Sequence, residues 1–175
     1  MEFFNKITVR ARTSFYLSIA EKLFEGLNKT DEGYVQAKEA LEHSWKWLNG
    51  DLITGDQLYE YLENEKDTGL MVFGYRYKND PVKVLIWKIL ITSLMYTIWQ
   101  AYQMENEKYL PQTIEDVDET IIDDFMSYTN KCQSFNTQWI ELLKSYLLKK
   151  FQTNDSNELG NPIQKNEIMK VINGV

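Results

Sequence analysis

The longest apolar stretch of the chain, residues 84–102, limits the folds that this sequence can adopt. It reads VLIWKILITSLMYTIWQAY, and 16 consecutive residues from Ile89 to Met104 carry no charge. Its length without Gly, Asn or Pro favours one buried helix, although its many β-branched residues leave a pair of buried strands as the competing interpretation. The uncharged run is short for a membrane span and Lys88 precedes it, so a central buried helix is favoured over a membrane contact.

Start and stop signals divide the chain into further helices. Asp80-Pro81 predicts the start of the apolar helix, which should run to about Glu107. Apolar residues spaced by three or four predict helices over 15–27 and 34–48, the second ending at Asn49-Gly50. Thr54 and Gln57 form a capping-box pattern that opens a short helix.

The second half of the chain is also predicted to be mostly helical. Residues 70–78 alternate partly like a strand, but a distorted helix is favoured because a short strand has no obvious partner. Thr113 is predicted to cap a helix with one apolar stripe from Ile114 to Cys132. A further helix is expected to bury Trp139, Leu142, Leu143, Tyr146 and Leu147, and Asn161-Pro162 should open a C-terminal helix.

These patterns predict an all-α fold. We expect a single-domain bundle of about six or seven helices, with a long buried central helix. Residues 1–151 should form the domain, and residues 152–175 a linker and a C-terminal helix that packs on it or trails it.

Few residues are suited to catalysis or to metal binding. The chain has one cysteine, Cys132, and one histidine, His43, which excludes an internal disulfide and most histidine-based metal sites. His43 follows Glu39 by four residues, but a di-iron bundle requires two such histidines. We interpret both residues as structural, and we predict no metal and no cofactor, because Gly-rich phosphate loops are also missing from the sequence.

The acidic residues are unevenly distributed. Residues 111–130 contain six acids and no base, within a chain whose net charge of −7 argues against nucleic-acid binding. In the predicted helix, Asp116, Glu119, Asp123 and Asp124 lie opposite the apolar stripe. They form either a solvated face or a surface that attracts a basic partner.

Five tryptophans are present, and four of them lie within apolar helical patterns that predict burial in the core. Trp47 is the exception, because it lies two residues after Trp45 and so on a different face of its helix. It either packs on the Asn49-Gly50 turn or is an exposed aromatic residue that binds a partner.

Several sequence fragments resemble one known family. They are HSWKWLNG (43–50), GDQLY (55–59), LENE (62–65), YTIWQAY (96–102), YLPQ (109–112) and VDE (117–119). Their order and spacing are similar to those of the immunity protein 6 family of bacterial polymorphic toxin systems, over about residues 14–151. The resemblance implies a mostly helical protein that protects the producing cell by binding a toxin.

The resulting hypothesis is an immunity protein that neutralises a cognate secreted toxin by occlusion, without catalysis. The partner is expected to be a basic nuclease, with no contact to nucleic acid or membrane, and the free protein a cytoplasmic monomer. The candidate contacts are Asp116, Glu119, Asp123 and Asp124 or, alternatively, Trp47, Asp51, Asp56 and Glu60. Two other functions remain open: a metal-dependent hydrolase using the acids of residues 115–124, and a helical scaffold or regulatory protein without a toxin partner.

Overall fold

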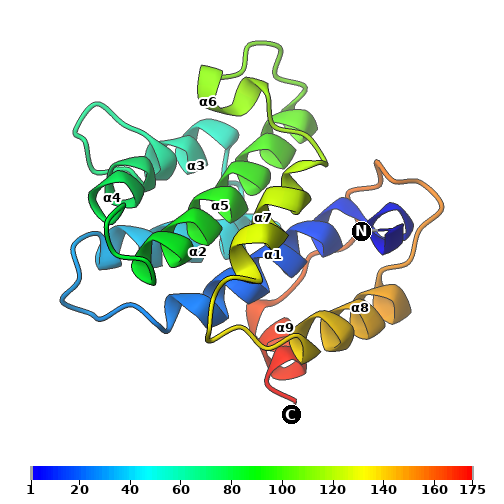
Figure 1. Cartoon of the computed structure of the whole chain (residues 1–175). Helices are drawn as coiled ribbons and strands as arrows, with labels where there is room; N and C mark the ends of the chain where they lie inside the picture. The colour runs from blue at the N-terminus through cyan, green and yellow to red at the C-terminus, as the bar shows by residue number, and fades with distance from the viewer. Residues whose placement is uncertain (1, 175) are drawn as a thin grey trace.

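Nine α-helices and one 3₁₀ helix make up the regular secondary structure of the computed structural model, which describes residues 2–174 (Figure 1). Within this range the only pairing of β type is an isolated bridge between Ile7 and Gln152. The elements are η1 (Glu2–Lys6), α1 (Val9–Phe24), α2 (Tyr34–Asn49), α3 (Gly55–Leu62), α4 (Leu70–Arg76), α5 (Lys83–Glu105), α6 (Gln112–Glu115), α7 (Ile121–Thr129), α8 (Gln138–Lys150) and α9 (Lys165–Ile172). The all-α prediction is confirmed, with short helices raising the number above the expected six or seven.

Helix α5 is the predicted central helix, and α1, α2, α3, α4 and α7 all pack against it. The Asp80 carboxylate accepts hydrogen bonds from the N–H groups of Val82 and Lys83, at 3.1 and 2.9 Å, which fixes the start of the helix. The helix ends at Glu105, two residues before the predicted Glu107, because the next residue, Asn106, adopts a left-handed conformation. Trp87 is fully buried, whereas Trp99 is only partly buried.

By length and composition, α5 is able to cross a membrane. However, 67% of its most apolar stretch is buried inside the fold. The core helix of a soluble protein has the same properties, so the burial of α5 supports the interpretation as a core helix.

Helix α1 is buried more completely than the sequence suggests. Every residue from 11 to 20 is buried, including Thr13, Ser14 and Ser18. These three hydroxyl groups donate to backbone carbonyl oxygens of the same helix, at 2.6–3.0 Å. Because the hydroxyl groups are satisfied inside the helix, α1 can be enclosed on all sides despite its mixed composition.

The C-terminal segment caps the start of α1. The N–H groups of Thr8, Val9 and Arg10 donate to the carbonyl oxygens of Phe151, Glu158 and Leu159, at 3.1, 2.9 and 3.0 Å. Donors at a helix N-terminus have no partner within the helix, so this backbone pairing replaces a side-chain cap. Helix α9 then packs against α8 and α1, and it begins at Lys165 rather than at Asn161-Pro162.

Two local predictions in the first half of the chain are confirmed. Thr54 and Gln57 form both hydrogen bonds of a capping box, at 3.0 and 3.1 Å, at the start of α3. Residues 70–76 form α4, so the helical interpretation of the ambiguous segment is correct.

The predicted continuous helix from Thr113 to Cys132 is wrong. The segment forms α6 and α7 with a turn at residues 116–120 between them, and Pro111 rather than Thr113 is the N-cap. In this turn the Asp118 carboxylate accepts hydrogen bonds from the Thr120 N–H and hydroxyl, at 2.7 and 2.6 Å. Such a local side-chain contact competes with helical hydrogen bonding and interrupts the helix.

Two residues of the predicted stripes also differ in detail. Cys132 is buried as predicted, although it lies beyond the end of α7. Leu142 was expected to face the core, but 40% of it is exposed on α8.

The cap on α1 can be tested with two glycines that share a left-handed conformation. A Cβ atom at Gly160 would lie 2.3 Å from the Thr8 hydroxyl oxygen, whereas one at Gly174 would meet nothing within 4 Å. We expect Gly160→Ala to lower the free energy of unfolding by about 1–3 kcal/mol more than Gly174→Ala does. Urea unfolding followed by circular dichroism measures the difference, and equal losses would show that the cap is not tightly packed.

Candidate interaction surface

The negative charge of the chain is concentrated in two segments, residues 50–63 and 103–119. Together they contain ten acidic residues and one basic residue, a net charge of −9, compared with −7 for the whole chain. The rest of the protein is therefore slightly positive. A charge distribution of this kind creates a strongly negative potential only if the two segments meet in space.

The fold brings the two segments together at the C-terminal end of α5. The Gly55 N–H, at the start of α3, donates to the Glu105 carboxylate at 2.8 Å. One turn earlier in α5, the Tyr102 hydroxyl donates to the Asp56 carboxylate at 2.8 Å. Figure 1 shows α3 and α6 beside this end of α5, with the loop of residues 106–111 leading from α5 to α6.

Helix α6 is joined to α3 through a second set of hydrogen bonds. The Glu63 carboxylate accepts from the hydroxyl groups of Tyr59 and Thr113, each at 2.8 Å. These bonds hold the pKa of Glu63 below its ordinary value, since they stabilise the charged form. The residue predicted to cap a helix, Thr113, therefore instead connects α6 to α3.

The acids that follow α6 surround a shallow hollow of about 200 Å³. Asp116, Asp118 and Asp124 line it together with Met95 of α5. Hydrogen bonds from Thr120 hold the pKa of Asp118 below its ordinary value. Thr113 also lines the hollow, so the hollow adjoins the Glu63 contact on α3.

We call this region the acidic surface. All of its acidic residues are exposed: Asp51, Asp56, Glu60, Glu63, Glu105, Glu107, Glu115, Asp116, Asp118 and Asp124. It includes five of the eight residues that the sequence singles out, namely Asp51, Asp56, Glu60, Asp116 and Asp124. The sequence presents these five as two alternative groups, and the Gly55–Glu105 and Thr113–Glu63 hydrogen bonds join the segments that carry most of them.

The other three candidates lie elsewhere. Asp123 is exposed on α7 but does not line the hollow. Trp47 is only 7% exposed, so it belongs to the core and the interpretation as an exposed binding aromatic is wrong.

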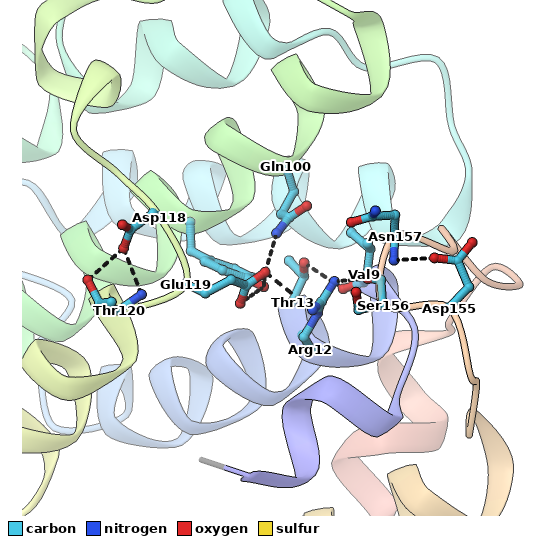
Figure 2. Close-up of polar contacts among 11 residues, drawn as sticks. Val9, Arg12, Thr13, Gln100, Asp118, Glu119, Thr120, Asp155, Ser156 and Asn157 are labelled. Atoms are coloured by element: carbon cyan, nitrogen blue, oxygen red, sulfur yellow. Dashed lines mark hydrogen bonds and ion pairs between the residues drawn. The ribbon is translucent and has the colours of Figure 1, made fainter.

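Glu119 differs from the other acids because its carboxylate pairs with a buried cation, although 43% of its side chain is exposed. Its carboxylate accepts hydrogen bonds from the Tyr96 hydroxyl at 3.0 Å and from the Gln100 amide at 3.4 Å. It also forms an ion pair with Arg12 of α1, at 3.3 Å (Figure 2). Burial, together with the charge of Glu119, raises the pKa of Tyr96, so its phenol remains protonated and acts as the donor.

The buried position of Arg12 explains the orientation of the Glu119 carboxylate. The residue is 3% exposed, and its guanidinium also donates to the Ser156 carbonyl oxygen of the C-terminal segment. A buried cation requires a counter-charge, and Glu119 supplies it. The sequence contains one signal for this pair: Arg12 lies three residues before Phe15, on the apolar stripe of its helix.

The single histidine is engaged in local contacts, as expected. His43 lies 2.9 Å from the Glu39 carbonyl oxygen through Nδ1 and 3.3 Å from the Tyr61 hydroxyl through Nε2. Within residues 2–174, no group of three His, Cys, Asp or Glu side chains is placed to hold a metal ion.

The role of Glu119 can be separated from that of its acidic neighbours. Glu119→Lys places a second cation beside the buried Arg12, so we expect it to lower the free energy of unfolding by about 1–3 kcal/mol. The matched change Asp124→Lys alters an exposed carboxylate and should stay within about 0.5 kcal/mol of the parent. Chemical denaturation of both variants measures this, and equal stabilities would contradict a structural role for Glu119.

Comparison with known proteins identifies the family. No curated protein and no solved structure matches the chain. A family model described as immunity protein Imm6 matches residues 11–132, from α1 through the end of α7, and leaves α8 and α9 outside the match. The match covers most of the chain, and the chain therefore belongs to the Imm6 family of immunity proteins.

Proposed function

We propose that this protein binds a cognate secreted bacterial toxin through the acidic surface and neutralises it by occlusion, without catalysis of its own. Membership of the Imm6 family supports the general role of toxin immunity. In this proposal the protein acts in the cytoplasm as a monomer until it meets the toxin. Covering a functional cleft requires only shape and charge complementarity, which a rigid helical end can provide.

We further propose that the toxin is a nuclease. The observation that supports this is the meeting of two acidic segments at one end of α5, where they carry a net charge of −8 when Glu119, which is paired with Arg12, is left out. Nucleases bind phosphate backbones through basic clefts, and an inhibitor with closely spaced carboxylates offers the same charge to such a cleft. Acidic residues that served only to keep the protein soluble would instead be spread over its whole surface.

Stability and binding are expected to depend on different acids. Asp51, Glu60 and Asp116 are exposed, whereas Glu119 forms an ion pair with the buried Arg12. Charge reversal at the exposed positions should therefore weaken toxin binding without unfolding the protein. Glu119 is not a contact in this proposal but a positioning residue for the turn that carries Asp116 and Asp118.

The test uses the toxin domain encoded beside this gene and a charge-reversed variant. We expect the wild-type protein to inhibit cleavage of DNA or RNA by that domain at a 1:1 ratio, leaving the toxin intact. Lysine at Asp51, Glu60 and Asp116 should slow association by about tenfold or more at low salt. The difference should shrink as salt rises, because exposed charges are screened beyond about 8–10 Å at physiological ionic strength.

A control variant has the same change in net charge at other exposed acids. Lysine at Glu25, Glu39 and Glu141 should leave the association rate much closer to that of the wild type. Absence of binding to the toxin domain would overturn the proposal as a whole. Binding to a toxin that cleaves no nucleic acid would overturn only the nuclease assignment.

A further inference from the structure

The two most exposed large apolar side chains within residues 2–174 both lie beside the acidic surface. Leu52 is 99% exposed and Tyr109 is 87% exposed. Leu52 follows Asp51 in the loop before α3, and Tyr109 lies two residues after Glu107 in the loop between α5 and α6. Neither residue is a contact candidate from the sequence, because no periodic pattern marks a loop residue, although Tyr109 begins the YLPQ fragment of the family resemblance.

Both side chains are carried by loops with defined hydrogen bonds. On either side of Leu52, the Asp51 N–H donates to the Lys46 carbonyl at 3.0 Å, and the Ile53 N–H donates to the Asp51 carbonyl at 2.8 Å. At Tyr109, the Glu107 carboxylate accepts the N–H groups of Lys108 and Tyr109, at 2.8 and 3.0 Å. Each apolar side chain is therefore presented on a backbone that is already ordered.

Both positions are close in sequence to the contact that joins residues 50–63 to residues 103–119. Leu52 lies three residues before Gly55, and Tyr109 lies four residues after Glu105. Gly55 and Glu105 are hydrogen-bonded to each other. The apolar pair therefore flanks the contact that joins α3 to α5. Such an arrangement, with apolar side chains surrounded by charge, resembles the centre and rim of a protein interface.

From this geometry, and resting on the proposed function, we infer that Leu52 and Tyr109 are the apolar anchors of the toxin interface. The partner surface that fits them is an apolar recess bordered by lysine and arginine side chains. Ordering costs are small when an anchor is held in place before binding, so most of its burial contributes to affinity. Tyrosine is also among the residues that contribute most at interfaces.

The anchors and the acids should have different kinetic effects. Exposed charges accelerate the encounter of the two proteins, whereas buried anchors determine how slowly the complex dissociates. A basic protein without the recess would be attracted by the acids but would dissociate quickly. The anchors would thus select the cognate toxin among proteins of similar charge.

The experiment compares an anchor variant with a matched control at the opposite end of α5. The anchor variant carries Leu52→Ala and Tyr109→Ala. The control carries Val82→Ala and Tyr75→Ala, since these residues are 59% and 68% exposed and lie beside the start of α5. A 23-residue helix, roughly 35 Å long, separates the two ends.

We expect the anchor variant to dissociate from the toxin domain roughly 30-fold faster or more, with little change in association rate or salt dependence. The control should behave like the wild type, and Tyr109→Phe alone should retain slow dissociation because the ring is kept. All variants should melt like the wild type, since the altered side chains are exposed. Surface plasmon resonance at two salt concentrations gives both rates.

Three results would overturn the inference. An unchanged dissociation rate in the anchor variant would show that the toxin does not contact Leu52 and Tyr109. An equal effect in the control would place the contact elsewhere. A wild-type dimer that becomes a monomer only in the anchor variant would assign the two residues to self-association. If the wild type did not bind the toxin domain at all, the proposed function itself would fail, which is a separate outcome.

Discussion

The buried guanidinium of Arg12 connects parts of the chain that are far apart in sequence. It lies on α1, pairs with Glu119 in the turn after α6, and donates to the Ser156 carbonyl in the C-terminal segment (Figure 2). An unpaired charge in the interior is costly, so these three segments must arrive together for α1 to be enclosed. The packing of α1, and through it much of the fold, depends on this paired cation.

The same contact also determines where the other acids lie. With Glu119 held against Tyr96 and Arg12, the turn that follows α6 lies along α5 and leaves Asp116 and Asp118 exposed. The bonds from Glu63 to Tyr59 and Thr113 join α6 to α3. The Glu119 carboxylate, paired with the buried Arg12, thus fixes a turn whose remaining carboxylates are exposed. This separates a residue needed for stability from those available to a partner.

The C-terminal region, which lies outside the family match, completes the hydrogen bonding at the start of α1. Residues 11–132 match the Imm6 model, but the first N–H groups of α1 are satisfied by Phe151, Glu158 and Leu159, beyond the match. Periodicity predicted a helix near the C-terminus, and α9 is present. The segment before α9 also caps α1. The sequence could not predict this contact, because backbone pairing of this kind depends on no particular side chain.

Local sequence determined the elements whose signals are local. The capping box at Thr54, the end of α2 at Gly50 and the apolar core of α5 each depend on neighbouring residues, and all three were predicted. Tertiary structure alone decided that the Glu119 carboxylate turns toward Arg12 and that α3 and α6, which both carry exposed acids, lie side by side. The physical reason is that a carboxylate has the same helical periodicity whether it faces water or a buried arginine, and only the three-dimensional position of Arg12 distinguishes the two.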